Sequence, residues 1–123
     1  MHDDDTQWGA WAQALAALAA QAREQDRVLS RALEDGVELL AYPLAGDGVL
    51  VGLGLGPARA ERLDTGALLR RRGLRMDRAG HWLPARFEDG SVFVLRRWPQ
   101  ASGPAWPGGV AEALRHAWEL FDE

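Results

Sequence analysis

The sequence predicts an α+β fold, in which three helices pack on a twisted antiparallel sheet of about five strands in the order α-β-β-α-β-β-β-α. Three observations lead to this prediction. An apolar stripe at helical spacing covers the N-terminal part of the chain, alternating segments separated by glycine-containing turns fill the middle, and a second helical stripe lies near the end. A chain of 123 residues fits one hydrophobic core, so we expect a single domain over residues 1–123.

The first expected helix runs from about Thr6 to Asp35. Its apolar side chains recur every three or four residues and therefore share one face; they are Trp8, Trp11, Leu15, Leu18, Ala22, Leu29 and Ala32. Gly36 follows, and glycine is favoured in the left-handed position after a helix. At 1.5 Å per residue such a helix would be roughly 45 Å long. We therefore expect it to bend, to overhang the sheet or to rest on a partner chain.

Two strands are expected next, Val37 to Leu44 and Val49 to Leu55, because a turn containing Asp47 and Gly48 is a hairpin signal. Successive side chains of a strand point to opposite faces. The second strand therefore places its large aliphatic side chains on one face: Val49, Val51, Leu53 and Leu55. Its other face carries Gly52 and Gly54, so we expect a flat surface that another element or another chain can approach closely.

A middle helix is expected within Ala58 to Arg72, and Asp64 is a candidate N-cap for a helix that starts afresh there. Three strands are expected to follow it: Leu74 to Asp77, His81 to Phe87 and Val92 to Trp98. Pro84 cannot donate a backbone hydrogen bond, which predicts that its strand lies at the edge of the sheet or contains a bulge.

The last expected helix runs from Val110 to Phe121, after a loop over Pro99 to Gly109 that contains Trp106. Its apolar residues also recur at helical spacing; they are Val110, Leu114, Ala117, Trp118 and Phe121.

Several classes of function are disfavoured by the sequence. The chain has no cysteine, its histidines lack the spacing of metal ligands, and the alternating glycines of residues 52–56 do not match a nucleotide-binding loop. We therefore expect no enzymatic activity, no metal and no cofactor. No apolar run is long enough to cross a membrane, and the acidic start differs from a secretory signal, so we expect a cytoplasmic protein.

Charge is unevenly distributed along the chain. Residues 59–97 hold ten arginines against five acidic residues, whereas residues 1–58 hold three arginines against nine. The basic segment could bind an acidic partner or nucleic acid, or it could complement the acidic parts of the same chain or of a second copy. Because the whole chain is acidic, with a net charge of −4, we favour self-complementarity and do not expect nucleic acid as the partner.

Six tryptophans are the stronger indication of function: Trp8, Trp11, Trp82, Trp98, Trp106 and Trp118. Tryptophan is enriched at the centres of protein interfaces, because it offers a large contact area at a small entropy cost. A small core can also hold half-buried tryptophans. We expect at least one of the six to lie at a binding surface.

The order of these elements resembles that of a class I type III secretion chaperone. The resemblance rests on the long first helix (Trp8 to Leu33), the hairpin (Val37 to Leu55), Ala67-Leu68-Leu69 in the middle helix, and the run from Ser91 to Trp98 before a terminal helix with Trp118. Proteins of this family are small, acidic, cytoplasmic and dimeric. They usually have three strands before the middle helix and two after it, whereas the residue pattern here predicts two and three.

The resemblance implies a homodimer that binds a secreted effector protein and keeps its N-terminal segment unfolded and competent for secretion. The effector would add a strand to an exposed sheet edge and bury apolar side chains in grooves. Leu68 and Leu69 would contribute to the dimer interface. The residues expected to line the partner-binding groove are Trp8, Trp11, Leu15, Leu40, Tyr42 and Trp82.

Two other functions remain open. An immunity or antitoxin-like protein would mask the basic active site of a toxin with an acidic surface, formed by Asp3 to Asp5, Glu34, Asp35, Glu38 and Asp47. A regulatory adaptor would instead use the arginine-rich segment 59–97. Binding through either charged surface should weaken steeply with salt, whereas binding in an apolar groove should not.

Overall fold

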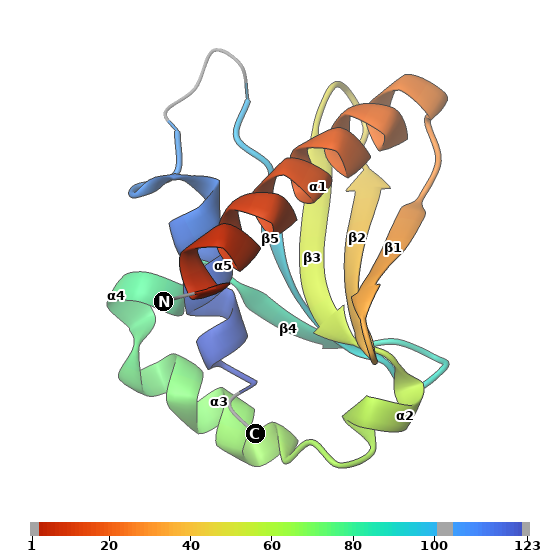
Figure 1. Ribbon diagram of the computed structural model, residues 1–123. Coiled ribbons are helices and arrows are strands. Elements are labelled where there is room, and N and C mark those ends of the chain that lie inside the picture. The colour runs from red at the N-terminus through yellow and green to blue at the C-terminus, as the bar shows by residue number, and fades with distance from the viewer. Residues whose placement is uncertain (1–2, 101–104, 122–123) are drawn as a thin grey trace.

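A five-stranded antiparallel sheet forms the centre of the protein, with the strand order β1-β2-β3-β5-β4 (Figure 1). The computed structural model describes residues 3–100 and 105–121, with side chains described from Thr6 onward. The strands are β1 (Leu29–Glu34), β2 (Val37–Pro43), β3 (Val49–Leu55), β4 (Leu83–Arg86) and β5 (Val92–Arg97). This architecture confirms the predicted α+β class and the antiparallel five-stranded sheet.

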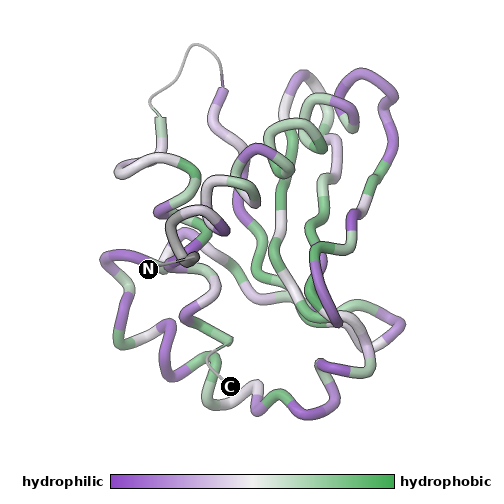
Figure 2. The backbone as a smooth tube through the Cα atoms, in the orientation of Figure 1, coloured by the Kyte–Doolittle hydropathy of each residue, from purple (hydrophilic) through white to green (hydrophobic). Residues whose placement is uncertain are grey.

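Helices α1 (Asp3–Gln25) and α5 (Gly109–Glu119) cover one face of the sheet (Figure 1). The alternation predicted for β3 is confirmed, because Val49, Val51, Leu53 and Leu55 are all buried on this face. The central strands β2 and β3 are among the most continuously hydrophobic parts of the chain (Figure 2). Burial of apolar surface is the main driving force for folding, so the sheet face beneath α1 and α5 is the core of the domain.

Three further helices connect β3 to β4 at the lower end of the view in Figure 1: α2 (Pro57–Ala60), α3 (Thr65–Leu74) and α4 (Met76–Ala79). Asp64 caps α3, since its Oδ1 accepts a hydrogen bond of 3.1 Å from the backbone N–H of Ala67. The predicted N-cap is therefore confirmed. The described part of the chain thus contains five helices, and the predicted count of three is wrong.

The first helix is shorter than predicted. It ends at Gln25, Asp26 adopts a positive φ of 51°, and Leu29–Glu34 pairs with β2 as an edge strand. Gly36 has the expected positive φ of 75°, but it lies in the turn between β1 and β2. A glycine with positive φ is favoured both after a helix and in a tight hairpin turn. Here Asp35 and Gly36 form the turn of the hairpin between β1 and β2.

The order of strands also differs from the prediction. Three strands precede α3 and two follow it, because residues 29–34 form a strand and residues 74–77 do not. The segment expected as a strand over Leu74 to Asp77 belongs instead to the end of α3 and the start of α4. Leu74 and Met76 are both exposed, so this segment has no buried face to hold it in a sheet.

Other predictions about the ends of the sheet are confirmed. Pro84 lies in β4, which is an edge strand. The terminal helix begins at Gly109, one residue before the predicted start at Val110. It ends at Glu119, two residues before the predicted end at Phe121. Among the described residues, no helix is long and apolar enough to cross a membrane.

Candidate partner-binding surfaces

On the face of the sheet opposite α1 and α5, side chains of one strand cover the glycines of its neighbour. A Cβ atom placed on Gly54 would lie 2.5 Å from the ring of Phe93, and one on Gly52 would lie 2.6 Å from Leu95 Cδ2. Phe93 is buried and stacks on Phe87, with ring centroids 5.2 Å apart. The flat surface expected at the glycines is therefore filled by side chains of β5.

Beside these glycines, an open hollow of about 590 Å³ lies at the edge of the sheet, where β4 begins and β5 ends. Leu83 faces it and is 57% exposed. The hollow is lined by Leu50, His81, Leu83, Pro84, Ala85, Leu95, Arg96, Arg97 and Trp106. None of these described lining residues is acidic. We call it the β4–β5 hollow.

Arg96 has an unusual environment at this hollow. Its guanidinium carbon lies 4.2 Å from the ring centroid of Trp106 and 5.7 Å from that of Trp82. Desolvation by burial lowers the pKa of Arg96 from its usual value. Among the described residues it has no hydrogen-bond acceptor and no ion-pair partner. Trp106 also makes edge contacts with Trp82 and Trp98, so the arginine rests on an aromatic cluster.

A second hollow, of about 230 Å³, lies on the other side of β4, against α3. Leu69 lines it and is 56% exposed, whereas the neighbouring Leu68 is only 1% exposed. Pro84 and Ala85 line both hollows. The complete lining of this α3–β4 hollow is Thr65, Leu68, Leu69, Pro84, Ala85, Arg86 and Val92.

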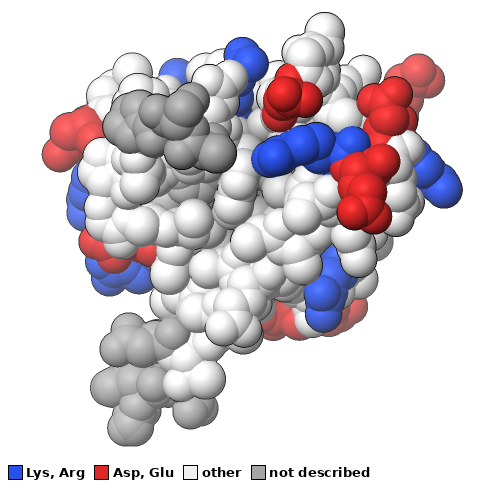
Figure 3. Space-filling model, turned by 90° about the horizontal axis from the view of Figure 1, so that it is seen from above, with Lys and Arg blue, Asp and Glu red and all other residues white. Residues whose placement is uncertain are grey.

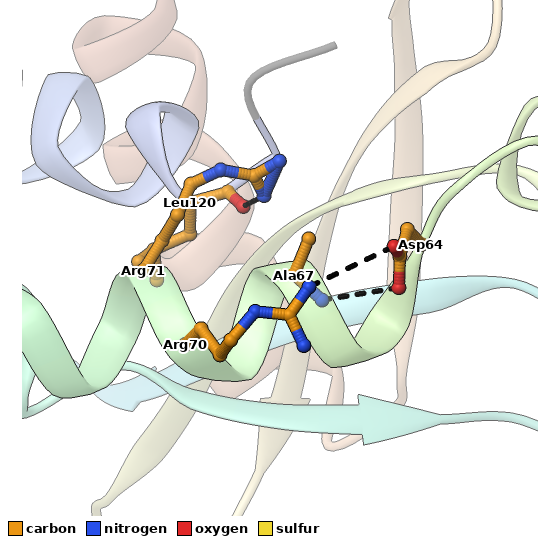
Figure 4. Close-up of polar contacts among 5 residues, drawn as sticks. All are labelled: Asp64, Ala67, Arg70, Arg71 and Leu120. Atoms are coloured by element: carbon orange, nitrogen blue, oxygen red, sulfur yellow. Dashed lines mark hydrogen bonds and ion pairs between the residues drawn. The ribbon is translucent and has the colours of Figure 1, made fainter.

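Arginines near α3 hold parts of the fold together. Arg71 Nη1 donates to the backbone carbonyl of Leu120 at 2.8 Å (Figure 4). Arg70 forms an exposed ion pair with Asp64, in which Nη2 lies 3.9 Å from Oδ2. Arg72 donates to the carbonyls of Trp82 at 2.8 Å and Gly80 at 2.7 Å. Hydrogen bonds from charged groups to backbone carbonyls are among the stronger ones. Arg71 and Arg72 therefore stabilise the fold through backbone carbonyls, and the charge self-complementarity of segment 59–97 stays a prediction.

A third hollow, of about 620 Å³, has mixed charge. Arg59 Nη1 donates to the carbonyl of Asp35 at 2.8 Å there. Its lining residues are Asp35, Arg59, Arg62, Leu63, Asp64, Arg71 and Phe121. Its described lining therefore contains two aspartates and three arginines, so charges of both signs face this hollow.

The six residues expected to line a partner groove do not share one surface. Trp11, Leu15 and Trp82 are buried in the core. Trp8 is half-buried beside Trp11, with ring centroids 4.9 Å apart. Leu40 is buried and Tyr42 is exposed, and both lie on strand β2. Their expected role in binding stays a prediction, and the core positions show that at least three of them stabilise the fold.

The acidic surface expected for an immunity protein is divided in a similar way. Glu34 and Asp35 lie at the β1–β2 turn, whereas Asp47 lies in the turn at the other end of β2. Glu38 is half-buried on β2 between them, and the side chains of residues 3–5 lie outside the described part. From above, acidic and basic side chains form small groups around a mostly uncharged surface (Figure 3).

Sequence reasoning missed the β4–β5 hollow and its arginine. A signal was present in β5, because Val92, Val94 and Arg96 alternate toward the same face. An arginine at an inward position of a strand marks a place where the core ends or where a charge needs a partner. Its contact with Trp106 depends on the loop before α5, which has no periodic pattern.

Comparisons with known protein families, with curated protein sequences and with solved structures find no match to this chain. Within residues 3–100 and 105–121, no group of three or more histidine and acidic side chains is arranged to hold a metal ion.

Proposed function

We propose that this protein is a homodimeric cytoplasmic chaperone or adaptor that binds a segment of a secreted effector protein. The proposal rests mainly on the apolar surface around β4, where Leu69 and Leu83 expose more than half of their side chains beside two adjoining hollows. Large exposed aliphatic residues that gather beside concave surfaces are typical of protein-binding sites.

The order of strands supports the same proposal. The class I type III secretion chaperones usually have three strands before the middle helix and two after it, and this chain has three before α3 and two after it. The residue pattern predicted two and three strands, so the observed order adds to the features that suggested the resemblance, whereas the long first helix to Leu33 is not among those observed.

The α3–β4 hollow is the proposed dimer interface. Leu69 extends from α3 beside this hollow, whereas Leu68 points into its own protomer. In a two-fold interface each copy presents the same patch, so an apolar side chain next to an apolar hollow can serve both partners. Of the two leucines predicted for the interface, Leu69 is therefore the appropriate probe.

Light scattering after size exclusion tests the dimer. We expect the 13.5 kDa chain to elute at twice its own mass. Leu69→Glu should give a monomer, because a buried interface does not tolerate an unpaired carboxylate. Val28→Glu is the matched control, since Val28 is similarly exposed but lies before β1, away from α3. A monomeric parent protein, or a dimer that survives Leu69→Glu, would contradict this interface.

Co-expression with the protein encoded beside it tests the chaperone function. We expect the partner to stay in solution and to co-purify through its N-terminal segment. The complex should persist at about 0.5 M NaCl, where charges more than a few ångströms apart are screened. Dissociation at that salt concentration would instead favour the immunity-like or arginine-based function.

A further inference from the structure

We propose that the β4–β5 hollow recognises an acidic side chain that stands next to an apolar one in an extended partner segment, and that Arg96 binds the carboxylate. The inference rests on the proposed function, because it takes the ligand to be part of a polypeptide. The segment must then carry a carboxylate beside an apolar side chain, and Arg96 binds that carboxylate.

The first argument concerns the guanidinium of Arg96, which contacts two indole rings but no acceptor in the described part of the chain. Arginine carries five N–H donors in a rigid fork. Those of Arg96 meet no acceptor among the described residues, while its flat face lies over Trp106. Taking N–H donors of a charged group partly out of water without an acceptor is unfavourable, and a bound carboxylate would offset that cost. Arg71 and Arg72 show the contrast, since both already donate to backbone carbonyls.

The composition of the lining is the second argument. Arg97 and His81 lie at the same hollow as Arg96, and no described lining residue is acidic, so the local charge favours an anion. Leu50, Leu83 and Leu95 supply an apolar wall. A ligand that is only an ion would leave that wall exposed, whereas an acidic residue beside a leucine would use both parts.

The geometry of the sheet edge is the third argument. The pairing of β4 with β5 begins at Leu83 opposite Leu95, so Arg96 and Arg97 extend past the end of β4. These two residues pair with β3 on one side, and the hollow of about 590 Å³ opens beside their other edge, which β4 leaves unpaired. An extended chain can lie along an unpaired strand edge and direct alternate side chains into adjacent pockets. A segment of a partner therefore fits this site better than a compact small molecule does.

Two blocked peptides test the site directly: Ac-Ser-Leu-Glu-Leu-Ser-NH2 and its analogue with glutamine in place of glutamate. Binding is followed by NMR through the indole N–H of Trp106 and the Nε–H of Arg96. We expect the glutamate peptide to shift both signals and to bind at least about tenfold more tightly than the glutamine peptide, because a charge-assisted hydrogen bond is stronger than a neutral one. Equal binding, or none, would overturn the inference.

Arg96→Met separates recognition from folding, because methionine keeps the apolar contact with Trp106 and removes the charge. We expect this variant to lose the preference for glutamate, with a melting temperature equal to or above that of the parent. Arg86→Met is the matched control: Arg86 lines only the α3–β4 hollow, so the preference should remain. An Arg96→Met variant that melts several degrees lower and still prefers glutamate would assign Arg96 a structural role and overturn the inference.

A charge-preserving variant covers the case in which Arg96→Met does not fold. Arg96→Lys should retain a weakened preference for glutamate, and its complete loss in a folded variant would contradict a charge-based contact. These peptides test neither the dimer nor the capture of a client. If the peptides do not bind, the proposed function is not contradicted. If the protein is not a dimer or captures no client, the peptide experiment still tests the role of Arg96.

Discussion

The two faces of the sheet are packed by different means, although β3 contributes to both. Toward α1 and α5, β3 presents Val51, Leu53 and Leu55, and the helices exclude water from them. On the opposite face it presents Gly52 and Gly54, and β5 fills the space with Phe93 and Leu95. We infer that the helix-covered face provides most of the stability, whereas apolar surface stays exposed at the β4 edge, where Leu83 lies.

The largest expected effect tests the helix-covered face. Leu53→Ala should lower the free energy of unfolding by about 3 to 4 kcal/mol, because it leaves a cavity in a fully buried site. Leu95→Ala makes the same chemical change on the opposite face of the sheet, where Leu95 is half-buried. It should lower the free energy of unfolding by about 1 kcal/mol. Urea denaturation of both variants measures the difference. Equal losses would show that the two faces stabilise the protein alike.

These same residues show how much the sequence predicts. The alternation of β3 and the cap at Asp64 are local patterns, and both are confirmed. The strand at residues 29–34 was predicted as helix, because Gly36 suits both a helix end and a hairpin turn, and only pairing with β2 decides between them. Local sequence does not contain that long-range contact.

The candidate site depends still more on contacts distant in sequence. Leu68 and Leu69 were both assigned to a dimer interface from the chaperone resemblance, but only Leu69 is exposed, and Leu68 is buried. The β4–β5 hollow instead combines residues from β3, β4, β5 and the loop that holds Trp106. The chaperone resemblance placed Trp82 in a partner groove, but it is buried against Trp106. Residue type alone does not distinguish a core tryptophan from an interfacial one.

A smaller effect is expected on the glycine side of β3. Gly54→Ala should cost about 2 kcal/mol, because its Cβ would lie 2.5 Å from both the Phe93 ring and the backbone oxygen of Val92. Gly9→Ala is the control, since a Cβ on Gly9 in helix α1 meets nothing within 4 Å. That variant should gain about 0.5 to 1 kcal/mol. Thermal denaturation compares the two, and a neutral Gly54→Ala would show that this face is loosely packed.

A further loss of stability, smaller than that of Leu53→Ala, is expected at the edge between the two hollows. Arg72 bonds the carbonyls of Gly80 and Trp82 just before β4, and so holds the start of that strand against α3. Arg72→Met should cost about 1 to 2 kcal/mol, because it leaves two partly buried carbonyls without their donor. Arg78→Met, an exposed arginine of α4, should change stability by less than about 0.5 kcal/mol. Hydrogen exchange provides the sharper measurement: in Arg72→Met the amide protons of β4 should exchange faster, while those of β2 should not change. Equal acceleration in both strands would mean that Arg72 stabilises the whole fold, and that the edge at β4 is not a separately held element.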